Sequence, residues 1–337
     1  MLYKSILVTG GTGSFGQAYI RNLVTKHKNI KRLIIFSRDE LKQNIMAEEF
    51  SEKKYPYIRY FLGDVRDAQR LSRALDRVEL VVHAAALKQV PAAEYNPIEF
   101  IKTNVMGAQN IIEACLGNKV KKVIALSTDK ACAPINLYGA TKLCSDKLFI
   151  AANNYAGGET KFSIVRYGNV LGSRGSVLPL ALKAKKNNTK FYLTKKEMTR
   201  FSITLTEGVE VVNWAANNLY GGEILIPKIP SYNLEDLIKA TEIKKNYKIS
   251  GLRKGEKIHE EMITSGDSYT TYDIGKYYFI LPDNDAKKIK LYKKKFKKMI
   301  KVKENFSYNS KDNKNFLNKK KIKEMIKDYQ LNSILKI

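Results

Sequence analysis

Residues 5–16 read SILVTGGTGSFG, and this stretch decides the fold that the sequence predicts. Its first five residues form an apolar run typical of a buried strand, and a helical pattern follows to about residue 26. Glycines three apart let the backbone turn tightly and approach a pyrophosphate, which the N-terminus of the helix then stabilises. A glycine pattern alone is weak evidence, but here the strand before it and the helix after it are both present. The predicted cofactor contacts in this stretch are Gly10, Thr12, Gly13, Ser14, Phe15 and Gly16.

The alternation of strand and helix continues to about residue 167. Further apolar runs lie at 32–36, 58–62, 80–82 and 123–126, and one of the helical patterns covers about 97–116. Strands that alternate with helices are typical of a parallel sheet with helices on both faces. We therefore predict an α/β protein built on a Rossmann-type doubly wound parallel sheet.

After residue 167 this alternation breaks down. We assign residues 1–166 to the nucleotide-binding domain and residues 167–285 to a smaller α/β substrate-binding region. The strand-like GEILIP at 222–227 should return to the main sheet, so the two regions are interleaved. Residues 286–337 contain lysine-rich helical patches and asparagine-rich loops. We expect them to form a C-terminal tail that is ordered only if it docks and is dispensable for chemistry.

Residues at the ends of the next strands complete the predicted cofactor site. An acid after the second strand would accept the 2′-hydroxyl of NAD, whereas Ser37 and Arg38 offer donors suited to a 2′-phosphate. This favours NADP, and the alternative is an arginine that caps the next helix. Asp64 either accepts from the adenine amino group or caps the helix that begins near residue 67. The other predicted contacts are Lys42, Val65, Ala84, Ala85, Ala86, Lys88 and Val170.

The stretch STDKACAPINLYGATK, residues 127–142, begins where the fifth strand should end and leads into a helix. Open α/β sheets bind their ligands at this edge. Tyr138 and Lys142 are four residues apart and share one helix face. Ionising a phenol at neutral pH costs about 4 kcal/mol, which one nearby ammonium can supply, so the two form a candidate proton-abstracting pair beside the cofactor. Thr128, Asp129 and Lys130 add a hydroxyl, an acid and an amine.

Arginines recur in the second half of the chain. Residues 172–179, GSRGSVLP, form a glycine-flanked loop that enters a helix, which suits a phosphate clamp. Two further arginines, Arg200 and Arg253, lie in the stretches TRF and GLRKGEK. We expect these segments to bind the anionic part of a substrate, with contacts from Arg174, Gly175, Ser176, Arg200 and Arg253.

Composition argues against several other classes of protein. The chain has no apolar run long enough for a membrane span and begins directly with a strand, so we expect a cytoplasmic protein. The formal net charge is +27, and residues 286–337 hold eighteen lysines against four acids. No arginine-led base readout or stacked-aromatic module accompanies this charge, so we expect no nucleic-acid partner. The three cysteines lack metal-ligand spacing, so we expect no metal site.

Taken together, these stretches resemble one superfamily. TGGTGSFG, HAAALKQVP, STDKA and YGNVLGSRGSV are similar to motifs of the extended short-chain dehydrogenases/reductases. Within that superfamily the chain resembles the inverting UDP-N-acetylglucosamine 4,6-dehydratases of pseudaminic acid synthesis. The resemblance is dense from residue 5 to about 265 and thin afterwards. Common hexose-nucleotide 4,6-dehydratases carry Thr-Asp-Glu where this chain has Thr128, Asp129 and Lys130.

The resemblance implies a reaction. Tyr138, assisted by Lys142 and Thr128, would take the proton of the sugar 4-hydroxyl while C4 passes hydride to NADP. Lys130 would then remove the C5 proton, and Asp129 would protonate the departing 6-hydroxyl. For this step Lys130 must be neutral, and burial beside the nicotinamide would favour the neutral amine by lowering its pKa.

The resemblance also implies a substrate and an assembly. The substrate would be UDP-N-acetylglucosamine and the enzyme a homo-oligomer. One alternative is a retaining or epimerising nucleotide-sugar 4,6-dehydratase of the same superfamily, and Tyr138 argues against the epimerising enzymes, which often lack it. Another is a non-catalytic NADP-binding regulator, but the acid and base residues are all present. The implied substrate contacts are Lys88, Thr128, Asn169, Arg174, Thr199, Arg253 and Glu256.

Overall fold

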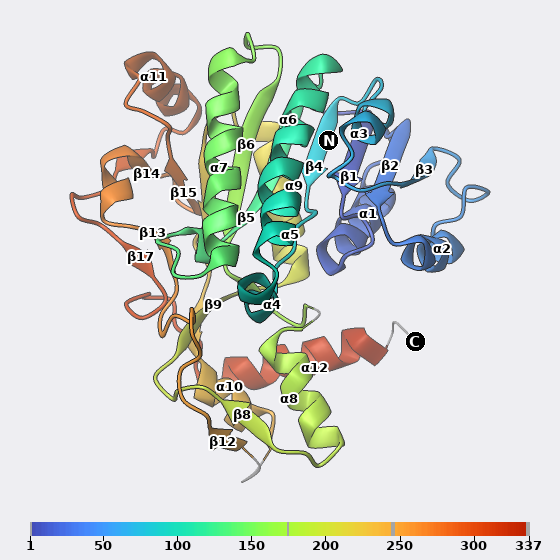
Figure 1. Cartoon of the computed structure of the whole chain (residues 1–337). Coiled ribbons are helices and arrows are strands. Elements are labelled where there is room, and N and C mark those ends of the chain that lie inside the picture. The colour runs from blue at the N-terminus through green and yellow to red at the C-terminus, as the bar shows by residue number, and fades with distance from the viewer. Residues whose placement is uncertain (1, 174, 244–246, 335–337) are drawn as a thin grey trace.

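A ten-stranded sheet is the centre of the protein (Figure 1). The computed structural model describes residues 2–173, 175–243 and 247–334. The sheet has the order β16-β14-β15-β10-β6-β5-β4-β1-β2-β3; the strands from β10 to β3 pair in parallel, and the other three extend the sheet in antiparallel fashion. The predicted doubly wound parallel sheet is therefore confirmed. The bounds are β1 Ser5–Thr9, β2 Arg32–Ser37, β3 Ile58–Leu62, β4 Leu80–His83, β5 Lys122–Thr128, β6 Lys161–Tyr167, β10 Ile224–Pro227, β14 Thr271–Asp273, β15 Tyr277–Ile280 and β16 Ile300–Lys301.

Helices cover both faces of this sheet, which is why its central strands read as continuous apolar runs. α3, α6 and α7 pack together on one face, and α1 packs against α9 on the other (Figure 1). α1 buries Tyr19, Ile20 and Leu23 at helical spacing. α9 begins with a capping box between Thr204 and Glu207. The bounds are α1 Ser14–Lys26, α2 Glu40–Glu49, α3 Ala68–Ala74, α6 Gly107–Gly117, α7 Leu137–Tyr155 and α9 Leu205–Asn218.

The segment after β4 differs from the single helix that we expected at 97–116. It consists of α4 Val90–Tyr95, α5 Pro97–Phe100 and a π-helical turn at Ile101–Met106, which continues into α6. Asn104 lies in the π-helical turn and is almost fully buried. Its side chain bonds both to the backbone N–H and to the carbonyl of Leu87 at 2.9 Å, and donates to Thr141 Oγ1 at 3.1 Å. The turn therefore ties the loop after β4 to α7, and π-helical turns are frequent at functional sites.

A smaller domain lies below the main sheet in Figure 1. Its own sheets are β11-β9-β7 and β12-β8. The chain passes from β9 to α9 and β10 in the main sheet and then returns to β11, so the two domains are interleaved. The bounds are β7 Asn169–Val170, β8 Phe191–Leu193, β9 Thr199–Ile203, β11 Ser231–Asn233, β12 Tyr247–Ile249, α8 Val177–Lys186 and α10 Leu234–Ala240, and two 3₁₀ turns lie at Asp129–Ala131 and Gly266–Thr270.

The C-terminal segment, residues 286–334, is not a separate tail. It forms α11 Ala286–Lys295, β16, β17 Tyr308–Asn309 paired with β13 Glu261–Ile263, and α12 Lys319–Ile334. Tyr292 is fully buried and its hydroxyl bonds to the buried carboxylate of Glu223. Ile322 of α12 is fully buried in the core of the smaller domain. The segment thus completes both cores, and its removal would expose them. None of the helices in the described ranges has the length and apolarity needed to cross a membrane.

Candidate active site

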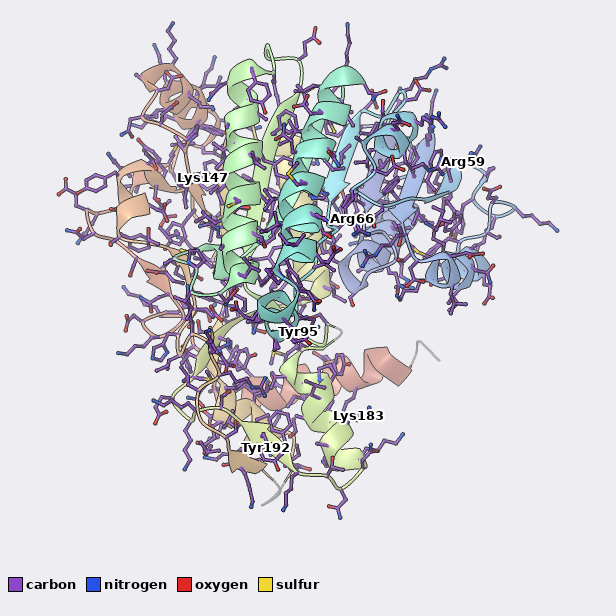
Figure 2. All side chains as sticks on the ribbon, in the orientation of Figure 1. Arg59, Arg66, Tyr95, Lys147, Lys183 and Tyr192 are labelled. Atoms are coloured by element: carbon purple, nitrogen blue, oxygen red, sulfur yellow. The ribbon has the colours of Figure 1, made fainter. Side chains whose placement is uncertain are left out.

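A cavity of about 820 Å³ opens at the carboxyl ends of the parallel strands, with walls from both domains. Every residue that the sequence assigned to the cofactor lines it. Tyr192 of β8, labelled in the lower domain in Figure 2, lines its other end. A ligand that fills the cavity would therefore contact the glycine loop and the smaller domain at once.

The glycine loop leaves room for a ligand only because side chains are absent. Gly10 has a φ of +63°, and a Cβ there would lie 2.9 Å from the backbone nitrogen of Ala85. A Cβ on Gly16 would lie 2.5 Å from the carbonyl oxygen of Gly10. α1 starts after Gly13, which makes no side-chain cap bond, so the first turn keeps N–H groups for an anion. This arrangement fits the pyrophosphate of a dinucleotide.

The far end of the cavity has the features that we expected around an adenosine. Ser37 Oγ is 2.7 Å from Thr12 Oγ1. Asp39 caps α2 and Asp67 caps α3, so neither Arg38 nor Asp64 serves as a helix cap. Instead Arg38 Nη1 lies 3.4 Å from Asp64 Oδ2.

Asp64 stays ionised beside these arginines. Arg66 pairs with its carboxylate at 2.8 Å. Burial opposes ionisation, but the hydrogen bonds of Arg66 and the charges of Arg66 and Arg38 lower the pKa of Asp64. A carboxylate acceptor and an arginine donor thus stand together at the end of β2.

His83 is a packed residue at the end of β4. Its Nδ1 lies 2.8 Å from Thr9 Oγ1, which joins β4 to β1. Burial first, and then the charge of Lys142, lower the pKa of His83 to about 3. The neutral ring of His83 does not line the cavity.

Tyr138 and Lys142 lie in the first turns of α7, and both line the cavity. The helix starts there because Asn136 caps it, accepting from the N–H of Gly139 at 2.8 Å. Burial raises the pKa of Tyr138 to about 12, although the charge of Lys130 and a hydrogen bond to Thr128 act in the opposite direction. Burial also lowers the pKa of Lys142. Lys130 is thus a cation that favours the phenolate, and the role that we expected for Lys142 stays a prediction.

Lys130 is held by three oxygen atoms. Its Nζ lies 3.1 Å from Asp129 Oδ1, 3.2 Å from Glu260 Oε1 and 3.3 Å from Asn169 Oδ1. Burial would lower the pKa of Lys130, but the two carboxylates outweigh it and the pKa is raised. Our expectation that burial keeps this amine neutral is therefore wrong for the protein without ligands.

Asp129 lies behind Lys130, fully buried and outside the cavity wall. Burial first, and then the nearby charge of Glu260, raise the pKa of Asp129. A carboxyl group in this position can carry a proton and give it up as an acid, as the resemblance implies.

Sequence reasoning missed Glu260. It is 2% exposed and also faces Arg200, whose Nε lies 3.6 Å from its Oε1. The motif GEKIHEEMI contains Glu260, but Glu256 is the residue of that motif that we predicted to contact the substrate. The segment between them is not helical, so sequence spacing gave no reason to place Glu260 against Lys130.

The predicted substrate contacts are brought together with one exception. Thr199 does not reach the cavity, because it is buried with its Oγ1 2.7 Å from Ser310 Oγ and 2.8 Å from His259 Nδ1. Arg174 lies outside the described residues. The others line the cavity, namely Lys88, Thr128, Asn169, Gly175, Ser176, Arg200, Arg253 and Glu256.

Comparison with known proteins adds the family. The model of a family described as polysaccharide biosynthesis protein matches residues 6–282. The chain belongs to this polysaccharide biosynthesis protein family. Its match runs from β1 to just beyond β15 and so includes every cavity residue discussed above.

Proteins that are similar to this chain bear the names of two kinds of enzyme. The inverting UDP-N-acetylglucosamine 4,6-dehydratase of Campylobacter jejuni is 52% identical over 332 residues, covering 96% of this chain and 97% of that protein. The UDP-glucose 4-epimerase of Rickettsia typhi is 40% identical over 331 residues, covering 96% and 95%. The solved structure of Pen from Bacillus thuringiensis is 35% identical with a TM-score of 0.89, covering 98% of this chain and all of that one. The predicted resemblance to inverting 4,6-dehydratases is confirmed.

Proposed function

We propose that this protein is a UDP-N-acetylglucosamine 4,6-dehydratase that inverts C5 of the sugar. The observation that carries the proposal is the 52% identity with the Campylobacter enzyme across nearly the whole of both chains. The cavity supports it, because a phenol, an amine and two carboxyl groups gather at the end of β5.

The residues present fit a nicotinamide dinucleotide. The space cleared by Gly10 and Gly16, and the uncapped first turn of α1, suit its pyrophosphate. We further propose NADP as the form used, because Ser37 and Arg38 line the cavity at the end of β2 and offer a hydroxyl and a guanidinium suited to a 2′-phosphate. A nicotinamide cofactor held by these residues would supply the redox chemistry of the reaction, a reversible hydride exchange with the sugar.

The chain's own residues then move the protons. Tyr138 takes the proton of the 4-hydroxyl, and the hydroxyl of Thr128 and the charge of Lys130 stabilise the phenolate. Oxidation at C4 acidifies the C5 hydrogen, which Lys130 removes on its cavity side. Asp129, which the hydroxyl of the cavity-lining Thr128 contacts at 3.0 Å, supplies the proton with which the 6-hydroxyl leaves as water. A proton from solvent then adds to C5 from the opposite face, which inverts that centre.

The test is the product formed from UDP-N-acetylglucosamine by the purified protein in heavy water, analysed by NMR. We expect a 4-keto-6-deoxy sugar of L-arabino configuration with deuterium at C5. A product of D-xylo configuration would place the chain with the retaining enzymes instead.

A second candidate is a UDP-glucose 4-epimerase, which the Rickettsia relatives favour. An epimerase keeps the 6-hydroxyl and needs neither a C5 base nor an acid for a leaving group. An epimerase would therefore give no catalytic role to Asp129, Lys130 and Glu260. The same NMR experiment with UDP-glucose and UDP-N-acetylglucosamine separates the two, because a 4-epimer retains its C6 oxygen.

The resemblance supports three finer proposals. We propose that the enzyme acts in the cytoplasm as a homo-oligomer, that it has no nucleic-acid or membrane partner, and that its product enters pseudaminic acid synthesis.

A further inference from the structure

Three ionisable side chains meet at the inner wall of the cavity. Lys130 lies between the carboxyl groups of Asp129 and Glu260, with its Nζ at 3.1 Å from one and 3.2 Å from the other. Asp129 and Lys130 follow β5, whereas Glu260 comes from the residue before β13. The amine is the only one of the three with substantial exposure, at 24% of its side chain, and that exposure faces the cavity.

Each carboxyl group also has one oxygen atom that makes no hydrogen bond within the described residues. Asp129 Oδ2 and Glu260 Oε2 are buried and have no hydrogen-bond partner among the described residues. A buried acceptor without a partner is unfavourable, and a carboxylate that takes up a proton there loses its charge in the low-dielectric interior. Asp129 can therefore hold a proton at rest, whereas the charges of Lys130, Arg200 and Lys257 lower the pKa of Glu260, so that Glu260 is a carboxylate at rest and can hold a proton only transiently.

We propose that Glu260 stores the proton that Lys130 must lose before it can act as a base, so that Glu260, Lys130 and Asp129 form a proton relay. The inference rests on the proposed function, because it gives Lys130 the task of removing the C5 proton. Glu260 acts through Lys130 and is a positioning residue rather than a catalytic one.

The proton balance of the relay closes. At rest Lys130 is an ammonium, Glu260 a carboxylate and Asp129 a carboxylic acid. The ammonium passes one proton to Glu260 across the 3.2 Å contact, and the free amine takes the C5 proton. Asp129 gives its proton to the leaving 6-hydroxyl and becomes a carboxylate. Glu260 then returns its proton to Lys130 while Lys130 hands one to Asp129 across the 3.1 Å contact, which restores the resting state.

The groups around Lys130 favour Glu260 as the acceptor of its proton. Asn169, the third neighbour of Lys130, is an amide and cannot take a proton. The charge of Lys130 first, and then that of Arg200, lower the pKa of Glu260 and hold it ionised at rest. The other N–H groups of Arg200 donate to the carbonyls of Thr199, Ile258 and Lys257. Other titratable groups around the relay in the described part of the chain include Tyr138 and Tyr232, which act on Lys130, and the ammonium of Lys257, which acts on Glu260.

Glu260→Gln tests the relay, because it keeps the shape and an oxygen for Lys130 but cannot store a proton. The variant should bind NADP and still oxidise C4, seen as transient NADPH absorbance. Dehydration and C5 deuterium uptake should fall by about 10²-fold near neutral pH. Lys130 must then lose its proton to solvent, so the rate should rise about tenfold per pH unit in a range where the wild-type rate is flat. A pH profile parallel to that of the wild type, or an unchanged rate, would overturn the proposal.

Two further variants control for a merely structural effect. Glu261→Gln makes the same change at the next residue, which forms no ion pair with Lys130 among the described residues, and should leave rate and pH profile unchanged. Glu260→Asp keeps a proton-accepting group, and should show a reduced rate without the rise at alkaline pH. An alkaline rise in Glu260→Asp equal to that of Glu260→Gln would contradict the relay.

Failure of the proposed function would be seen separately, as a wild type that forms no dehydrated product. The relay remains testable in that case through the ¹⁵N signal of Lys130 Nζ, assigned by its absence in Lys130→Ala. We expect this amine to lose its proton at lower pH in Glu260→Gln than in the wild type. Equal titration in the two proteins would refute the coupling whatever the substrate.

Discussion

Replacing Arg38 by alanine should change the choice of cofactor while leaving the fold intact. The guanidinium is 55% exposed, and the ion pair that it forms among the described residues is with Asp64 at 3.4 Å, so its loss removes no buried contact. Asp64 keeps its pair with Arg66 at 2.8 Å. A charge-assisted bond to a phosphate is worth about 1.5–3 kcal/mol, and solvent screening at this exposure reduces that to about 1–2 kcal/mol. We therefore expect NADP to bind about 5–30-fold more weakly and NAD to bind as before.

Calorimetric titration of both dinucleotides into the wild type and the variant measures this difference. Arg73→Ala is the matched control, because Arg73 is an exposed arginine of α3 and does not line the cavity. It should leave both affinities unchanged. An equal loss of NADP and NAD affinity in Arg38→Ala, or a wild type that prefers NAD, would refute the assignment of Arg38 to a 2′-phosphate.

Three other variants probe the chemistry, the packing and the pH dependence. Lys130→Ala should retain NADP and transient C4 oxidation but lose dehydration by about 10²–10⁴-fold in turnover assays, and a near-normal rate would move the base elsewhere. Tyr292→Phe, which removes a partner of the buried Glu223, should lower the free energy of unfolding by about 1–3 kcal/mol in urea titrations without changing turnover of the folded enzyme. His83, with its pKa lowered from 6.5 to about 3, should be protonated only on unfolding in that range, so stability falls as pH drops. Between neutral pH and about pH 5 the loss should be about 2 kcal/mol larger in the wild type than in His83→Asn, and equal losses would contradict this.

The parts of the site that the sequence predicted depend on local signals. A parallel sheet brings the carboxyl ends of its strands to one edge, so residues that follow successive strands must meet there. Gly10 follows β1, Ser37 ends β2, Ala84 follows β4 and Thr128 ends β5. Each was found from a short apolar run and the residues directly after it. The cofactor end of the cavity could therefore be assembled from the sequence in some detail.

The parts that could not be predicted depend on contacts between distant segments. Asn104 sits in a π-helical turn, and an apolar periodicity does not reveal one extra residue in a helix. Thr199 was taken for a substrate contact, but its hydroxyl is used by Ser310, 111 residues away. Glu260 meets Lys130 across 130 residues of sequence for the same kind of reason. None of these pairings has a signature in composition or spacing.

The C-terminal segment connects the packing of the protein to its chemistry. Ser310 receives a hydrogen bond at 2.9 Å from the backbone N–H of Glu260, and its own N–H donates to the Glu260 carbonyl at 2.7 Å. The same serine bonds to Thr199, next to Arg200. Ser310, which belongs to none of the motifs, thus fixes the positions of Glu260 and Arg200. These two residues set the charge around Lys130. The lysine that replaces the glutamate of the common Thr-Asp-Glu triplet is supplied with a carboxylate after all, from the smaller domain. In the relay that we propose, proton acceptance is divided between an amine that faces the cavity and a carboxylate behind it, and the position of that carboxylate depends on the docking of this segment.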